Sequence, residues 1–205
     1  MDFVMAPIDY FLRGGLCMWP LLACSIGAIF IGRERFQYFK NCMSGTKFTL
    51  DFEDLMNKGQ LQEALDLAKN TKGDGAALCA EMMTDYKEYG KRFQSVVFFR
   101  IDRIIGHMND HMNMLGVIIG LSPMLGLLGT ITGMISSFNA LNERMANPMA
   151  VTAGIGEALI TTVFGLVISI VAMCLHAYLT RRIKGAALDL DELGSVLVDV
   201  LAKKE

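Results

Sequence analysis

Residues 120–135 read GLSPMLGLLGTITGMI and contain no charged side chain. The charge-free run around them spans residues 111–142, and two further runs of this kind span residues 14–32 and 158–180. Each run reaches the roughly 18 apolar residues that are typical of a transmembrane helix. Buried helices of soluble proteins seldom go so long without a charge on any face. The sequence therefore predicts a membrane protein with three spans.

These spans divide an all-α fold into membrane and cytoplasmic parts. The second run is too long for the bilayer, because 32 residues of helix measure about 48 Å and the hydrocarbon core is about 30 Å thick. We expect the surplus to continue as helix into the cytoplasm, back toward Phe98 and Ile105, and Pro123 to kink it. The expected parts are an outer interfacial helix at 1–13, transmembrane helix 1 at 14–32, a cytoplasmic helical region at 33–112, transmembrane helix 2 at 113–141, an outer loop at 142–153, transmembrane helix 3 at 154–180 and a cytoplasmic amphipathic helix at 181–205.

Basic residues set the orientation, because Lys and Arg next to a span stay on the cytoplasmic side. Clusters of them follow the first and third spans, at Arg33, Arg35, Lys40, Arg181, Arg182 and Lys184. With these clusters inside, only Arg13 and Arg144 of the 19 Lys and Arg residues lie outside. We therefore expect an outer N-terminus and a cytoplasmic C-terminus.

Several functions are disfavoured by composition and motifs. The formal net charge of −2 argues against binding of nucleic acid, which needs a clustered basic face. His107 and His111 stand four residues apart beside Asp110, but no third metal ligand is evident nearby. The cysteines form no CxxC pair, so we expect neither disulfides nor a metal site. No phosphate-binding loop, nucleophile motif or dinucleotide fingerprint is present, so we expect no enzyme and no cofactor.

Small and hydroxyl residues recur in the second and third spans. Glycines lie three or four residues apart at Gly126, Gly129 and Gly133 in the second span. In the third span, small residues have the same spacing at Gly154, Ala158, Thr161 and Gly165. Small residues at this spacing let helix backbones approach closely in lipid. The simplest interpretation is therefore a seam between two packed helices, with the glycines and threonines serving only that packing.

Position along the chain gives the polar residues a second interpretation. The outer loop is centred near Ala146, and Thr130 and Thr162 each lie 16 residues from it. In an antiparallel hairpin their hydroxyls should meet at one depth, well inside the bilayer, where an unpaired polar group is costly. Glu157 shares a helix face with Thr161, four residues on. An acid inside a span marks an ion path or a buried partner, although Glu157 can instead extend to the outer headgroups. We expect this polar stripe to face a pore or a partner helix.

Three stretches resemble one family of membrane proteins. GLSPMLGLLGTITGMI at 120–135 resembles the second-span signature of the MotA/TolQ/ExbB proton channel family, and GIGEALITTVFGL at 154–166 resembles its third-span signature. GGLCMWPLL at 14–22, followed by RER at 33–35, is similar to the first span of ExbB-type members. The three stretches stand in the family's order, so the resemblance covers essentially the whole chain.

The resemblance implies a homo-pentameric ring in the inner membrane of a diderm bacterium. Such a ring surrounds a dimer of an ExbD-like single-span subunit, which supplies a membrane aspartate and works with a TonB-like energy transducer. Carried over by position, Thr130 and Thr162 are the pore threonines and Glu157 is the outer-half glutamate. A proton-driven motor that energises outer-membrane transport is the implied function.

Several alternatives stay open. The first-span motif favours an ExbB-type role over a TolQ-type role in envelope maintenance, and MotA-type members typically have a fourth span. A passive scaffold for partner helices and a small transporter built from this chain alone are further possibilities. The chain departs from the family at Val171, where many relatives have proline, so the inner half of the third span should be straighter.

Overall fold

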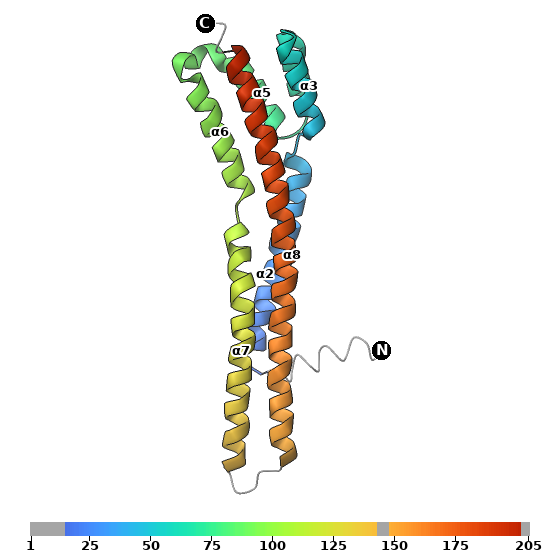
Figure 1. Ribbon diagram of the computed structural model, residues 1–205, viewed down its shortest axis with the longest axis vertical. Helices are drawn as coiled ribbons and strands as arrows, with labels where there is room; N and C mark the ends of the chain where they lie inside the picture. Colours follow the sequence, from blue (N-terminus) through green and yellow to red (C-terminus); the bar gives the residue numbers. More distant parts are fainter. Residues whose placement is uncertain (1–14, 143–147, 202–205) are drawn as a thin grey trace. The chain divides into compact units, whose positions relative to one another are not determined.

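The computed structural model describes residues 15–142 and 148–201, which fold into helices with no strand among them (Figure 1). The expected all-α fold is confirmed. The interfacial helix expected at 1–13 and residues 143–147 of the outer loop expected at 142–153 lie outside the described residues. Residues 148–153, which were expected to belong to this loop, instead form the start of a helix. The helices are α2 (Met18–Cys42), α3 (Thr46–Asn57), α4 (Leu61–Asn70), α5 (Asp74–Tyr89), the 3₁₀ turn η1 (Gly90–Arg92), α6 (Phe93–Met108), α7 (Met112–Asn142) and α8 (Pro148–Leu201).

The chain divides into two compact units. The first contains Met1–Arg33 and His111–Ala177, and the second contains Glu34–Asp110 and Tyr178–Glu205. Two stretches of the described chain are long and apolar enough to cross a membrane, and they lie within Asp74–Asn139 and Gly154–Leu201. The first of these includes most of α7, and the second is most of α8. The expected first span, in α2, is not among them and stays a prediction.

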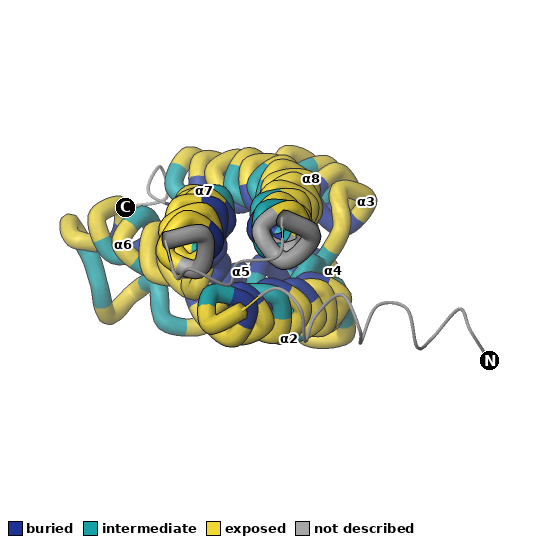
Figure 2. Tube along the Cα trace, turned by 90° about the horizontal axis from the view of Figure 1, so that it is seen from below, coloured by how far each residue is buried: buried dark blue, intermediate teal, exposed yellow. Residues whose placement is uncertain are grey.

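In the first unit, the N-terminal half of α2 packs against α7 and α8. A methyl group added at Gly27 would lie 3.5 Å from Ile118 of α7, and one added at Gly32 would lie 2.6 Å from Leu175 of α8. Figure 2 shows that much of α7 and α8 is exposed. Large apolar side chains contribute to this exposed surface, such as Phe30 of α2 and Met124 of α7, which are 67% and 69% exposed. A surface of this kind is rare on a soluble monomer and suits lipid or partner helices.

The helix expected to run from the second span back to Phe98 is broken, so that expectation is wrong. α6 ends at Met108 and α7 begins at Met112. Between them His111 has a φ of 63°, a left-handed conformation that a right-handed helix cannot contain. Asn109 is the C-cap of α6, and its backbone N–H donates to the carbonyl of Ile105 at 3.0 Å.

The second unit is a small helical domain built from α3 to α6 and the ends of α2 and α8. The amphipathic tail expected as a separate helix at 181–205 instead continues α8 without a break to Leu201. Its apolar face packs within this unit, since Leu190 and Leu197 are buried. A methyl group added at Gly194 would lie 2.5 Å from Ile101 of α6. Glycine at this position therefore lets α8 approach α6 closely.

Arg35 connects α2 to the end of α6. Its guanidinium is nearly enclosed, with the whole residue only 4% exposed. One nitrogen donates to the carbonyl of His107 at 2.8 Å, and another pairs with Glu34 at 2.9 Å. The last carbonyls of a helix lack partners within it, and a cation is favourable there. Arg35 therefore caps α6 just before the break.

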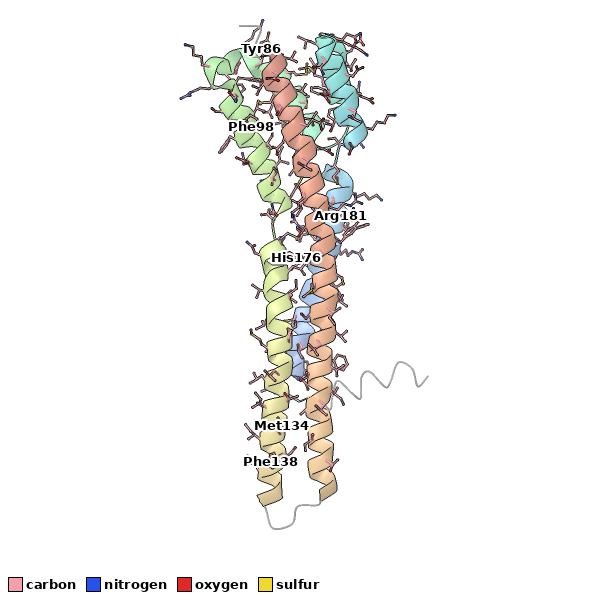
Figure 3. The ribbon with its side chains drawn as sticks, viewed as in Figure 1. Tyr86, Phe98, Met134, Phe138, His176 and Arg181 are labelled. Atoms are coloured by element: carbon pink, nitrogen blue, oxygen red, sulfur yellow. The ribbon has the colours of Figure 1, made fainter. Side chains whose placement is uncertain are left out.

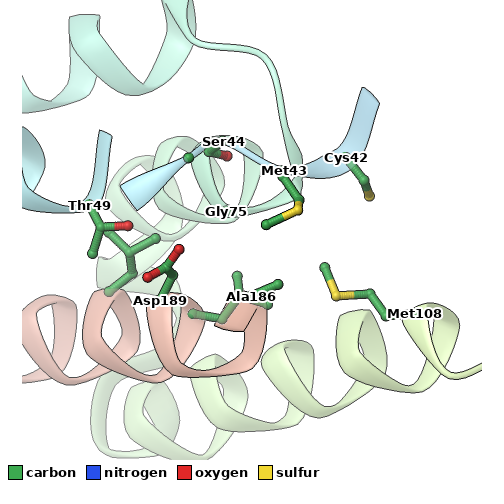
Figure 4. A pocket seen from close by; sticks show the side chains of 11 residues that line it. Cys42, Met43, Ser44, Thr49, Gly75, Met108, Ala186 and Asp189 are labelled. Atoms are coloured by element: carbon green, nitrogen blue, oxygen red, sulfur yellow. The ribbon is translucent and has the colours of Figure 1, made fainter. Parts of the chain in front are cut away.

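A cluster of polar groups joins the end of α2 to the start of α5. The Cys42 thiol and the Tyr38 hydroxyl both contact the carboxylate of Asp74, the latter at 3.3 Å. Burial, together with the hydrogen bond to Asp74, raises the pKa of the Cys42 thiol to about 12. Beside this cluster lies a cavity of about 20 Å³ (Figure 4). It has room for about one water molecule.

Candidate functional site

The polar residues singled out from the sequence meet where α7 packs against α8. The five glycines expected to serve helix packing all lie on this contact, which we call the glycine seam; they are Gly126, Gly129, Gly133, Gly154 and Gly165. Small residues of α7 and α8 face one another along the seam, so the two backbones can approach closely. No charged side chain lies on it among the residues whose side chains the structure describes.

The closest approach between the two backbones is near Ser122 of α7 and Gly165 of α8. A methyl group added at Gly165 would lie 2.5 Å from the carbonyl oxygen of Ser122 and 3.1 Å from the Cα of Gly126. One added at Gly126 would lie 3.0 Å from the Cα of Thr162. These distances are shorter than ordinary van der Waals contact. Only glycine therefore fits at the two positions without moving a helix.

Closer to the C-terminal end of α7, side chains of α8 fill the space left by glycines of α7. A methyl group added at Gly129 would lie 2.5 Å from the Cγ2 of Thr161, and one added at Gly133 would lie 2.6 Å from the Cβ of Ala158. Thr161 is consequently almost fully buried, at 1% exposure. At the N-terminal end of α8 the two helices exchange roles, because Gly154 of α8 faces the hydroxyl of Ser137 of α7.

Thr162 makes the polar contact that joins the two helices at the seam. Its hydroxyl donates to the carbonyl of Gly126 at 2.8 Å. The contact is possible because Gly126 has no side chain to cover its carbonyl. The hydroxyl retains lone pairs that can accept a proton.

Thr130 lies near this contact but not in it. Its hydroxyl donates to the carbonyl of Leu127 in its own helix at 2.7 Å, and the residue is 9% exposed. Counting 16 residues from Ala146 along each helix predicts that Thr130 and Thr162 lie at the same depth. In the structure Thr162 pairs with Gly126, four residues or about 6 Å along α7. The hairpin is therefore not symmetric about Ala146.

The hydroxyls of Ser122 and Ser137 are also satisfied by backbone carbonyls. Ser122 donates to Ile118 at 2.8 Å and Ser137 donates to Gly133 at 2.9 Å. Such internal pairing is what a membrane interior demands, because no water is there to replace it. Glu157 lies in α8, but its side chain lies outside the described residues.

A second contact between the helices was not found from the sequence. Pro123 has no N–H, so the carbonyl of Ile119 loses the partner it would have in an uninterrupted helix. The hydroxyl of Ser169 on α8 donates to this carbonyl at 2.7 Å. Ser169 is 5% exposed. The sequence signal for such a contact is a proline in one span and a serine in the next. The register of the two helices must also be known, because it decides which serine reaches the free carbonyl.

No metal centre forms from the described residues, which contain no group of three potential ligands. His107 instead contacts Asp110 at 3.3 Å, and His111 stands in the break before α7. The five cysteines are free.

The hairpin of α7 and α8 lies within the part of the chain that matches a known protein family. Residues 61–192 match the family model of the MotA/TolQ/ExbB proton channel family. The chain belongs to this family. The matched range includes all of α7, the glycine seam and α8 as far as Glu192.

Curated relatives carry names from two branches of the MotA/TolQ/ExbB family. An ExbB homolog of Methanothermobacter thermautotrophicus is 29% identical over 89% of this chain and 66% of its own length. An ExbB-like biopolymer transport protein of Synechocystis is 34% identical over 81% of this chain and 67% of its own length. The Tol-Pal system protein TolQ of Haemophilus influenzae is 31% identical over 47% of this chain and 45% of its own length. The chain thus spans about two thirds of the length of the first two relatives.

Proposed function

We propose that this chain is the ring-forming, proton-conducting subunit of an ExbB-like inner-membrane motor. Family membership and the ExbB names of relatives that match most of the chain support this function. The observation that carries it is the Thr162 hydroxyl, which joins α7 and α8 in a charge-free part of the chain. Protons would move inward along the seam hydroxyls, with Thr162, Thr130 and Thr161 on the path and Glu157 nearer the outside.

The proposed assembly is a homo-pentamer around a dimer of an ExbD-like single-span subunit. Large exposed apolar side chains on α7 and α8 support association with other helices or with lipid. Examples are Val163 on α8 and Phe138 on α7 (Figure 3). The partner would supply a membrane aspartate and connect to a TonB-like energy transducer. The N-terminus lies outside and the C-terminus in the cytoplasm in this arrangement.

The energy for the motor comes from the membrane potential and the proton gradient. Moving one elementary charge through 100 mV releases about 2.3 kcal/mol. A hydroxyl can pass a proton without net change, because it accepts one proton on a lone pair and releases another. We propose that Thr162 exchanges protons with the partner aspartate in this way and that the exchange drives rearrangement of the partner helices. The work would reach the outer envelope through the partner.

The test is Thr162→Val in the complex with its single-span partner, reconstituted in liposomes. Valine keeps the shape of threonine and removes the hydroxyl, so we expect proton flux to fall at least tenfold while the native mass of the complex is unchanged. The matched control is Thr132→Val, because Thr132 is exposed and its hydroxyl donates only to carbonyls of its own helix, Leu128 and Gly129. Flux that survives Thr162→Val and matches the control would rule out the path.

Two other functions give different results in the same experiment. A TolQ-like role in envelope maintenance, supported by the relative from Haemophilus influenzae, predicts the same flux but rescue of a TolQ-deficient strain rather than an ExbB-deficient one. A passive scaffold predicts assembly with the partner and no flux from the unaltered complex. A transporter built from this chain alone predicts flux without the partner.

A further inference from the structure

The second unit contains a basic groove between the end of α2 and α8. It consists of two adjoining hollows of about 390 and 500 Å³. Both are lined by Met43, Thr46, Tyr178 and Arg182; Lys40 completes the first and Arg181 the second. The groove therefore combines three positive charges with apolar and aromatic surface.

The three basic side chains are available to bind an anion. None of Lys40, Arg181 and Arg182 forms an ion pair with any residue that the structure describes. Arg182 is held in place by Tyr178, whose hydroxyl accepts from its Nε at 3.2 Å and whose ring lies 5.6 Å from the guanidinium carbon. This contact uses only one of the N–H groups of Arg182. The others can form the paired hydrogen bonds that guanidinium makes to phosphate.

The single acid of the groove does not cancel this charge. Asp189 lines the second hollow, and its carboxylate accepts a hydrogen bond from the Thr46 hydroxyl at 3.3 Å. Asp189 also lines the cavity of about 20 Å³ shown in Figure 4. One carboxylate against three cations leaves a net positive groove.

Part of the lining of the groove is apolar and exposed, which distinguishes it from a site for a soluble anion. Phe36 is 57% exposed, Tyr178 44% and Leu188 70%. These side chains come from the same two helix segments as the basic residues. Exposed aromatic and aliphatic groups beside Lys and Arg are typical of the membrane interface, where a lipid meets both at once.

The position of the groove along the chain agrees with this interface. The first charge-free run ends at residue 32, four residues before Phe36, and the third ends at residue 180, directly before Arg181. In Figure 3, Arg181 follows His176 along α8 where the charge-free stretch ends. Basic pockets at the cytoplasmic ends of spans bind the headgroups of anionic lipids.

We infer that this groove binds one anionic phospholipid of the cytoplasmic leaflet. The lipid phosphate lies among Lys40, Arg181 and Arg182, and its glycerol and upper acyl chains lie against Phe36, Tyr178 and Leu188. The inference rests on the membrane location of the chain and not on proton conduction. Its failure is therefore distinguishable from failure of the proposed channel function.

The test is native mass spectrometry of the purified full-length protein in a neutral detergent. Phosphatidylglycerol and phosphatidylcholine with identical acyl chains are titrated separately, and glycerol phosphate is added as a soluble competitor. We expect phosphatidylglycerol to bind at least tenfold more tightly than phosphatidylcholine and glycerol phosphate not to displace it. Arg182→Gln should weaken binding of phosphatidylglycerol about fivefold, and the triple Gln variant at positions 40, 181 and 182 about a hundredfold.

The matched control is Lys87→Gln. Lys87 also lies over a tyrosine ring, that of Tyr86 at 5.8 Å, but lines none of the hollows described above. Equal binding of the two lipids, or equal loss with Lys87→Gln, would overturn the inference. Displacement by glycerol phosphate would indicate a site for a soluble phosphate compound instead. Loss of the native oligomer with Arg182→Gln would show that the groove is a contact between subunits.

Discussion

Replacing Gly165 with alanine should separate α7 from α8. The added methyl group would lie 2.5 Å from the carbonyl oxygen of Ser122, about 0.9 Å inside ordinary van der Waals contact. Both groups belong to helix backbones, so no side chain can turn away to make room. We expect the helices to move apart and the hydrogen bond from Thr162 to Gly126 to lengthen or break.

The size of the effect follows from three contributions. Overpacking costs about 1–3 kcal/mol, and loss of one hydrogen bond between transmembrane helices costs about 0.6 kcal/mol. Alanine also favours helix over glycine by about 0.5–1 kcal/mol, which offsets part of the loss. We therefore expect Gly165→Ala to lower the free energy of unfolding by about 1–3 kcal/mol.

The free energy of unfolding is measured by titration with sodium dodecyl sulfate in mixed micelles, followed by the fluorescence of Trp19. This residue is the single tryptophan of the chain and lies at the start of α2 in the same unit. The control is Gly120→Ala on α7, where an added methyl group meets nothing within 4 Å. The control should be neutral or slightly stabilising. If Gly165→Ala were as stable as Gly120→Ala, the close approach of the two backbones would be refuted.

Three further predictions concern other contacts. Ser169→Ala should lower the free energy of unfolding by about 1 kcal/mol. The loss should be smaller in a Pro123→Ala background, where the Ile119 carbonyl regains an N–H partner. The same loss in both backgrounds would contradict the pairing of Ser169 with this carbonyl. Arg35→Gln should cost about 1.5–3 kcal/mol in the same titration, because a charged hydrogen bond to the end of α6 is lost. Folding raises the pKa of the Cys42 thiol from 9.0 to about 12. The stability that this thiol contributes is therefore complete below pH 9 and is lost as the pH rises toward 12. Iodoacetamide at pH 8 should modify Cys42 only after unfolding, and peptide mass spectrometry can check this.

Elements with a strong local signal were predictable from the sequence. The charge-free run at 111–142 corresponds closely to α7. The small residues of the seam could be identified because their spacing of three or four places them on one helix face. The extent of a helix and the face on which its small residues lie both depend on residues close together in the sequence. They can therefore be predicted from a single sequence.

The register of the hairpin was not predictable in the same way. Counting from Ala146 assumes that both helices leave the loop at equal depth, whereas the pairing of Thr162 with Gly126 is decided by which small residues fit together. The contact of Ser169 with the carbonyl freed by Pro123 depends on that register too. The break before α7 had a local signal, because Asn109 and Asp110 both favour turns, but the charge-free run that follows obscured it.

The hydrogen bond from Thr162 to Gly126 also determines how often and how fast the hydroxyl is free. If opening this bond costs about 0.6 kcal/mol, the average contribution of such bonds between transmembrane helices, the hydroxyl is free for about a quarter of the time at 25 °C. Rotamer changes of exposed side chains take picoseconds to nanoseconds. Domain and helix motions take microseconds to milliseconds. The hydroxyl is therefore released and recaptured many times during a single helix motion. In a conducting ring Thr162 would thus be a fast relay, and the turnover rate would be set by the slower movement of the helices.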